Sequence, residues 1–104
     1  IGSAGSYGEY NILDIVQSRS ASNIELSFLN NDSYTLLDNV LRSENKMTEN
    51  ETIVNSSNYI STNETLVKKF KKYGIGIENM EFFALMNVAK EFDIDIAGIF
   101  VITN

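Results

Sequence analysis

The chain has 104 residues, with eight Lys and Arg against fourteen Asp and Glu and a formal net charge of −6. It contains no His, Cys, Pro or Trp. The absence of Cys excludes disulfides, zinc–thiolate sites and a thiol nucleophile, and the absence of His excludes an imidazole base or metal ligand. A general acid or base in this chain is therefore a carboxylate, a Lys or a Tyr.

Composition also limits the class of protein. The apolar share of 43% is enough for a hydrophobic core, and residues 1–104 fit one domain or part of one. No apolar run approaches the roughly 20 residues of a membrane-spanning helix, and the chain shows no signal-peptide pattern. The acidic balance argues against a nucleic-acid partner. We expect a soluble, cytoplasmic protein that binds neither membrane nor nucleic acid.

Both ends of the chain are abrupt. It opens at Ile1 rather than Met, and it stops two residues after the apolar run 96–102. Such a run is typical of a buried strand, whereas chain termini usually lie in solvent. We expect a piece of a longer protein; the alternative is a natural domain whose last strand docks at its C-terminus.

The first half of the chain alternates short apolar segments with turn-forming ones. The pattern predicts a Gly-rich loop over residues 1–8, strands over 12–16, 21–28 and 52–55, a turn over 30–33 and a loop over 43–51. The strand at 21–28 is predicted because Ile24, Leu26 and Phe28 alternate with polar residues. A helix with one apolar face is predicted from the i, i+1, i+4, i+5 spacing of Leu36, Leu37, Val40 and Leu41.

The second half alternates helices with strands. Ser61 and Glu64 have the spacing of a capping box, and the helix behind them is expected to end at Gly74. Residues 75–77 are predicted as a strand, 80–92 as a helix apolar nearly all round and so buried on more than one side, and the last strand from about 95. The lysines within 68–72 are interpreted as a solvated helix face rather than a nucleic-acid contact. This alternation predicts an α/β architecture with a largely parallel sheet.

Three segments carry candidate binding groups. Residues 2–5 (Gly-Ser-Ala-Gly) allow a ligand to approach the backbone closely, and Ser3 adds a hydroxyl; a tight turn is the alternative. Residues 78–81 lie where a strand passes into a helix, a common ligand position in open α/β sheets. There Glu81 either accepts hydrogen bonds from a diol such as ribose or interacts with the helix N-terminus. Residues 102–104 bring polar groups to the end of a buried strand, either as a site or as the exit of the strand from the core.

Taken in order, these segments resemble motifs of the nucleoside phosphorylase/nucleosidase superfamily, whose members cleave N-glycosidic bonds. Gly-Ser-Ala-Gly at 2–5, followed by Asp-Ile-Val at 14–16, is similar to the family's Gly-Ser/Thr-Ala/Cys-Gly loop and Asp-Val-Val strand end. Asn-Met-Glu at 79–81 resembles its Glu-Met-Glu motif at the start of an Ala-rich helix, and Ile-Thr-Asn at 102–104 resembles its Val-Ser-Asp strand end. The resemblance spans the chain and rests on the order of the motifs.

The resemblance implies a three-layer α/β fold with a mixed, largely parallel central sheet, of which this chain is the central portion. It implies that Met80 and Glu81 bind ribose, that Ser3 binds phosphate and that Asn104 is catalytic. Cleavage develops positive charge on the ribose, which a carboxylate stabilises, and negative charge on the departing base. The base contacts that it implies are Ala4, Gly5, Tyr59, Asn79 and Thr103.

Two residues depart from the family pattern. Asn79 replaces the first acidic residue of Glu-Met-Glu, and Asn104 replaces the Asp that is expected to protonate purine N7. An amide cannot deliver a proton at neutral pH, although it can hydrogen-bond a developing anion. The trimeric purine phosphorylases also resemble this chain in having Asn at that strand end. The family's basic phosphate ligands have no counterpart in these residues.

From the resemblance we expect phosphorolysis of purine nucleosides to free base and ribose 1-phosphate, with inorganic phosphate as co-substrate and neither cofactor nor metal. One alternative is a nucleosidase that uses water, and another is a non-catalytic nucleoside-binding or structural fragment. We expect the 104 residues alone not to turn over. The resemblance also implies a dimer-based homo-oligomer.

Overall fold

The computed structural model describes residues 1–32, 34, 39–44, 52–57 and 61–104. Within these ranges the chain forms seven strands and three helices. The strands are β1 (Gly2–Ser6), β2 (Ile15–Ser18), β3 (Ser20–Ser22), β4 (Val40–Arg42), β5 (Ile53–Asn55), β6 (Ile75–Glu78) and β7 (Gly98–Ile102). The helices are α1 (Leu26–Leu29), α2 (Glu64–Lys72) and α3 (Phe82–Glu91).

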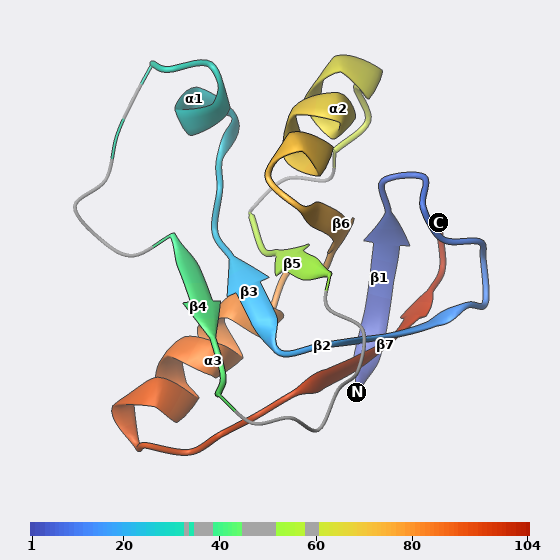
Figure 1. Ribbon diagram of the computed structural model, residues 1–104. Coiled ribbons are helices and arrows are strands. Elements are labelled where there is room, and N and C mark those ends of the chain that lie inside the picture. The colour runs from blue at the N-terminus through green and yellow to red at the C-terminus, as the bar shows by residue number, and fades with distance from the viewer. Residues whose placement is uncertain (33, 35–38, 45–51, 58–60) are drawn as a thin grey trace.

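All seven strands belong to one mixed sheet in the order β2-β7-β1-β6-β5-β3-β4 (Figure 1). Three of its pairings are parallel, β1 with β7, β3 with β5 and β5 with β6, and the other three are antiparallel. The first and last strands of the chain, β1 and β7, lie side by side as the third and second strands of this order. The predicted mixed α/β sheet is confirmed, but the sheet is not largely parallel, because half of its pairings are antiparallel.

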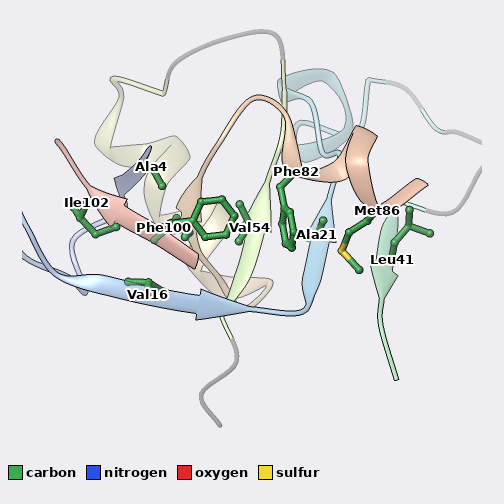
Figure 2. Close-up of a cluster of buried hydrophobic side chains, with 10 residues drawn as sticks. Ala4, Val16, Ala21, Leu41, Val54, Phe82, Met86, Phe100 and Ile102 are labelled. Carbon is green, nitrogen blue, oxygen red and sulfur yellow. The ribbon is translucent and has the colours of Figure 1, made fainter. Parts of the chain in front are cut away.

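Helices cover both faces of this sheet, which gives the predicted three layers (Figure 1). On one face, Phe82 and Met86 of α3 pack over Ala21, Leu41 and neighbouring strand residues (Figure 2). The second core, on the side of α1 and α2, consists of Tyr7, Ile24, Leu29, Phe70 and Ile75. Each core removes apolar surface from water, which is the main stabilising contribution in a domain of this size.

A register irregularity in β6 lets this short strand serve both cores. The pairing with β5 runs from Ile53 with Ile75 directly to Val54 with Ile77, so that Gly76 is the extra residue of a bulge. Ile75 therefore joins the α2-side core and Ile77 the α3-side core, although residues two positions apart would share one face of a regular strand. A Cβ at Gly76 would collide with the Thr52 side chain, which explains the glycine.

The Gly-rich segment predicted as a loop is instead the central strand β1. Glycine and serine have low intrinsic strand propensity, but hydrogen bonding to β6 on one side and β7 on the other overrides it. A small residue is favoured at position 5, where a Cβ would lie only 3.2 Å from Asn104 Oδ1, whereas a Cβ at Gly2 would make an ordinary contact of 3.4 Å with Asn79 Nδ2.

Two further predictions in the first half are wrong. The strand predicted over 21–28 ends at Ser22, and Leu26–Leu29 forms the helix α1. Residues four positions apart lie on one side of a strand and also on one side of a helix, so the apolar pair Ile24 and Phe28 did not distinguish the two structures. The helix predicted from the stripe ending at Leu41 is the strand β4 at Val40–Arg42, which pairs with β3. The remainder of that stripe, Leu36 and Leu37, lies outside the described residues, as does most of the 43–51 loop.

The N-cap of helix α2 lies two residues after Ser61, the N-cap that the capping-box spacing predicted. This N-cap is Asn63, whose Oδ1 accepts a hydrogen bond from the Thr65 backbone N–H at 2.8 Å. The Ser61 backbone N–H instead donates to Glu78. The predicted stop is confirmed: Gly74 has φ +79°, a left-handed conformation that favours glycine after a helix.

The α3 helix is buried on one face only, contrary to the prediction. Phe82, Met86 and Ala89 face the core, whereas Leu85 and Val88 are more than half exposed. The sheet meets a single face of this helix in the described part of the chain, so an apolar composition all round did not mean burial all round. No described helix is long and apolar enough to cross a membrane.

Candidate functional site

One cleft of about 210 Å³ brings the three candidate segments together. Residues 3–5 enter it from β1, residues 78–81 from the junction of β6 and α3, and residues 103 and 104 from the end of β7. These segments are separated by up to 100 positions in sequence. The lining consists of Ser3, Ala4, Gly5, Asn55, Ser57, Glu78, Asn79, Met80, Glu81, Thr103 and Asn104.

Strand register explains why these segments meet. Gly5 of β1 pairs with Glu78 at the end of β6, so the β6–α3 junction lies beside the middle of β1. On its other side β1 runs parallel to β7, and the pairing continues past the strand end. The Thr103 N–H donates to the Ala4 carbonyl at 3.0 Å, and the Ser6 N–H donates to the Asn104 carbonyl at 2.8 Å. The carboxyl ends of β6 and β7 therefore both reach β1, where polar side chains gather.

The Asn79 side chain ties two of the segments together. Its Oδ1 accepts hydrogen bonds from the N–H groups of Glu81 at 3.0 Å and Phe82 at 2.9 Å, which caps the start of α3. Its Nδ2 donates to the Ser3 carbonyl of β1 at 2.8 Å. These three bonds occupy the amide oxygen and one amide hydrogen, so Asn79 fixes the position of α3 against β1.

Ser56 completes the first turn of α3. Its hydroxyl donates to the Asn79 carbonyl at 2.5 Å and accepts from the Phe83 N–H at 3.0 Å. With the two N–H groups capped by Asn79, three consecutive amides at the helix start are paired. The start of α3 is thus closed by side chains of the protein itself, which leaves the adjoining Met80 and Glu81 to face the cleft.

Glu81 and Met80 are accessible side chains of the cleft. Glu81 is the N-cap residue of α3 by position, yet its side chain makes no capping hydrogen bond, and Asn79 performs that role. Glu81 still lies at the helix N-terminus, where a carboxylate interacts favourably with the helix dipole, and its side chain also lines the cleft. Met80 is 55% exposed, an unusual position for a flexible apolar side chain unless something covers it.

At the other end of the cleft, Asn104 lies against Gly5. A Cβ on residue 5 would lie 3.2 Å from Asn104 Oδ1, 3.5 Å from Asn104 Nδ2 and 3.5 Å from Glu78 Cγ. The glycine therefore keeps open a space between an amide and a carboxylate. Thr103 and Asn104 are exposed, and the Thr103 hydroxyl donates to Asn104 Oδ1 at 3.4 Å.

The Glu78 side chain accepts hydrogen bonds from two distant segments. Its Oε2 accepts from the Tyr7 hydroxyl at 2.7 Å, and its Oε1 accepts from the Ser61 N–H at 3.1 Å. Burial raises the pKa of Tyr7, and the hydrogen bond to Glu78 raises it further. Tyr7 is therefore a neutral donor at physiological pH, and its ring stacks on Phe70 with centroids 5.1 Å apart.

Asn55 is a buried residue of the cleft lining. It is fully buried, and its Oδ1 accepts from the Ser22 hydroxyl at 2.7 Å and from the Ile24 N–H at 2.9 Å, while its Nδ2 donates to the Ile24 carbonyl at 3.1 Å. A buried amide must be hydrogen-bonded in this way to avoid a large desolvation cost. Asn55 thus joins β5 to the chain that follows β3.

The structure brings eight of the nine sequence-predicted site residues into this one cleft, all except Tyr59, which lies outside the described residues. Sequence reasoning did not select Asn55 or Ser57, and it assigned no role to Glu78, although Glu78 belongs to the candidate segment 78–81. Asn55 and Glu78 each sit at the last position of a strand, β5 and β6, and these strands are neighbours. Polar residues ending adjacent parallel strands were the signal that could have found them.

The charge of the cleft is entirely acidic. Of its lining residues, Glu78 and Glu81 carry charge and no Lys or Arg contributes. Across the described ranges, no three acidic side chains come together in a way that could hold a metal ion. Two carboxylates among amides, hydroxyls and backbone suit a ligand rich in hydroxyl and N–H donors, or one that develops positive charge.

Neither a family model nor a curated protein matches the sequence. Solved structures do match the fold. A mutant of Helicobacter pylori MTAN with 5'-methylthioadenosine in the active site has a TM-score of 0.76 at 12% identity, with 97% of this chain and 52% of that chain covered. A futalosine hydrolase mutant of Helicobacter pylori has a TM-score of 0.77 at 12% identity, with coverage of 98% and 54%.

A third structure, the 5'-methylthioadenosine/S-adenosylhomocysteine nucleosidase of Neisseria meningitidis in complex with methylthio-immucillin-A, has a TM-score of 0.71 at 14% identity. It is covered over 53% of its length by 97% of this chain. The chain thus spans about half the length of the solved structures that it matches. These enzymes belong to the nucleoside phosphorylase/nucleosidase superfamily, so the resemblance drawn from the motifs is confirmed at the level of the fold.

Proposed function

We propose that the protein represented by this chain cleaves the N-glycosidic bond of a nucleoside, and that these residues supply the ribose and base sides of the site. The observation that carries the proposal is the single cleft in which residues 3–5, 78–81 and 103–104 converge. These segments were selected from the sequence by their resemblance to nucleoside-binding motifs. Their convergence is independent of that resemblance, because it follows from the strand register.

The ribose is assigned to Met80 and Glu81. The Glu81 carboxylate accepts hydrogen bonds from the ribose hydroxyls, and Met80 packs against the apolar face of the sugar. As the glycosidic bond breaks, positive charge develops on the ribose, and a carboxylate beside it stabilises that charge. The absence of a capping hydrogen bond at Glu81 supports this assignment.

The base is assigned to the opposite end of the cleft. The backbone of Ala4 and Gly5 borders it, and Thr103 and Asn104 address its polar edge, with Tyr59 stacking on the base as the resemblance implies. Asn104 donates a hydrogen bond to the nitrogen on which negative charge collects, but an amide does not protonate it. Asn79, first assigned to the base, is now assigned a positioning role, because most of its amide is engaged with α3 and Ser3.

We propose water as the acceptor in the first candidate reaction, because the neighbours reported above include a hydrolase and a nucleosidase by name. Phosphorolysis with inorganic phosphate, as first expected, is the second candidate, and Ser3, exposed on the cleft wall, is the residue here that would contact phosphate. The proposal includes no cofactor besides this co-substrate.

The test is release of free base by the full-length gene product. Adenosine, inosine and 5'-methylthioadenosine are incubated with the protein, with and without phosphate, and the products are separated chromatographically. Base release without phosphate supports hydrolysis, and strictly phosphate-dependent release of ribose 1-phosphate supports phosphorolysis. Nucleoside binding without release of base from any of them supports the non-catalytic alternative and contradicts cleavage.

The ribose assignment has its own variant. Glu81→Ala is expected to weaken nucleoside binding on the order of 10-fold or more, because it removes a charged acceptor of hydrogen bonds. Glu91→Ala, at the exposed far end of α3, is the matched control and leaves affinity unchanged. Unchanged affinity in Glu81→Ala would remove Glu81 from the site.

Self-association belongs to the same proposal, since the resemblance implies a homo-oligomer. The α3 helix presents Leu85, Val88 and Phe92, which are 60%, 57% and 72% exposed, on the face turned away from the sheet. Exposed apolar side chains gathered on one helix face are typical of an interaction surface. Sedimentation of the full-length gene product over a range of concentrations tests this; a monomer at all concentrations contradicts it.

A further inference from the structure

Glu78 belongs to the candidate segment 78–81, but the motifs assign it no role. It is the last residue of β6 and pairs with Gly5 of β1 on one side and Asn55 of β5 on the other. Its side chain is half-buried and lines the cleft. Partial burial of a carboxylate costs free energy unless hydrogen bonds compensate for the lost water.

Two donors hold this carboxylate in one orientation. The Tyr7 hydroxyl donates to Oε2 at 2.7 Å, and the Ser61 N–H donates to Oε1 at 3.1 Å. Tyr7 is itself fixed, because it is 4% exposed and its ring stacks on Phe70. A carboxylate has about four acceptor positions; within the described residues, the Tyr7 hydroxyl uses one of them, and the Ser61 N–H is shared between Oε1 at 3.1 Å and Oε2 at 3.4 Å. Glu78 is therefore held rigidly while keeping acceptor capacity.

Glu78 and Asn104 both line the cleft beside Gly5. A Cβ on residue 5 would touch both Glu78 Cγ, at 3.5 Å, and Asn104 Oδ1, at 3.2 Å, so the two side chains border the same volume. Asn104 offers both an amide donor and an acceptor, whereas the ionised carboxylate of Glu78 only accepts. A ligand group that fits between them presents an N–H toward Glu78.

We propose that Glu78 is a specificity-determining residue that accepts a hydrogen bond from an N–H group of the nucleobase, with Tyr7 as the residue that positions it. The site thereby selects nucleosides whose base carries an amino group or a ring N–H on the edge that enters between Glu78 and Asn104. This inference rests on the proposed function, since it assigns the base to this end of the cleft.

A purely structural role predicts a different result. If Glu78 only anchored the chain at Ser61, its replacement would alter stability but not the preference between two bases. Glu78→Gln separates the roles well. The glutamine oxygen can still accept from the Ser61 N–H, and its amide can donate to the Tyr7 hydroxyl, because a hydroxyl accepts as well as donates. The fold contacts are kept, and the charged acceptor is lost.

The experiment compares two probes in equilibrium binding to the full-length gene product. One probe is adenosine or inosine, whichever binds more tightly, since each base carries an N–H; the other is purine riboside, whose base has none. The wild-type protein is expected to prefer the first on the order of 10- to 100-fold, the strength of a hydrogen bond to a charged group. In Glu78→Gln this ratio falls toward one, and in the matched control Glu91→Gln it is unchanged.

Tyr7→Phe provides a second variant. It leaves the charge in place and removes the donor to Oε2, so the ratio is expected to fall with the protein still folded, as checked by circular dichroism. A wild-type ratio near one overturns the inference. An unchanged ratio in Glu78→Gln also overturns it. If Glu78→Gln does not fold, an unchanged ratio in Tyr7→Phe overturns it instead. If the wild-type protein binds no nucleoside, the proposed function fails, and this inference fails with it.

Discussion

Replacement of Asn79 by alanine tests how the cleft is built. The Asn79 side chain bonds both to β1 and to the start of α3, through its Nδ2 to the Ser3 carbonyl and its Oδ1 to the N–H groups of Glu81 and Phe82. Alanine removes all three hydrogen bonds without adding bulk. The substitution should therefore destabilise the fold and loosen the junction that carries Met80 and Glu81.

The magnitude follows from two separate losses. Loss of a side-chain cap at a helix start costs about 1 kcal/mol, and loss of the hydrogen bond to Ser3 costs about 1 kcal/mol more. Ser3 is exposed, so water can reach its carbonyl and no further desolvation cost arises. The free energy of unfolding should therefore fall by about 2 kcal/mol, which corresponds to a melting temperature lower by roughly 8 to 16 °C in a chain of this size.

Urea unfolding followed by circular dichroism measures this change, with two companion variants. Asn79→Asp keeps an acceptor for the cap and places negative charge at the helix N-terminus, so about half of the loss is expected. Asn87→Ala lies on the exposed face of α3 and should leave stability unchanged or slightly raised, because alanine favours the helix. The reasoning is refuted if Asn79→Ala lies within 0.5 kcal/mol of the wild type, or if Asn79→Asp is as damaging as Asn79→Ala.

Three other predictions concern the fold. Gly98→Ala should lower the free energy of unfolding by about 1 to 3 kcal/mol, because its Cβ would lie 2.5 Å from Phe100 Cε2; a urea midpoint equal to that of the wild type contradicts this. Asn63→Ala should lower the free energy of unfolding by about 1 kcal/mol through loss of a helix cap, whereas Ser61→Ala should lower it much less. If Ser61→Ala lowers the melting temperature more than Asn63→Ala, Ser61 is the N-cap, as the capping-box spacing predicted. The raised pKa of Tyr7 stabilises the fold fully below the ordinary tyrosine pKa of 10.0, and this stability is lost as pH rises above it. Tyr7→Phe should remove that part of the alkaline decline in stability, and an identical decline in both proteins would count against it.

The secondary structure that the sequence predicted correctly is the part that local patterns determine. The strands at β5, β6 and β7 and the two longer helices follow from apolar runs and helical spacing extending over several residues. Gly74 ends α2 because only glycine adopts its φ readily. Where the pattern was short the sequence was ambiguous, as at Ile24 and Phe28, whose spacing of four suits either structure.

The failed predictions share a physical cause, which is pairing between distant segments. No local signal makes a strand of Gly2–Ser6; hydrogen bonds from β6 and β7 on both of its edges do. Likewise Val40–Arg42 is extended because β3 offers it an edge, and the exposed face of α3 follows from which elements reach that helix. Propensity is a weak prior in each case, and tertiary contacts override it.

The sequence by itself determined the chemistry that these 104 residues supply: carboxylates, amides, hydroxyls and backbone, with no imidazole or thiol. It also determined which three segments carry that chemistry, because short motifs in order are visible without a structure. Only the tertiary structure decided that the segments meet, since the register of β1 against β6 and β7 places Gly5 between Glu78 and Asn104. It alone gave Glu78 and Tyr7 a place in the site, because a hydrogen bond between residues 71 positions apart has no signature in sequence.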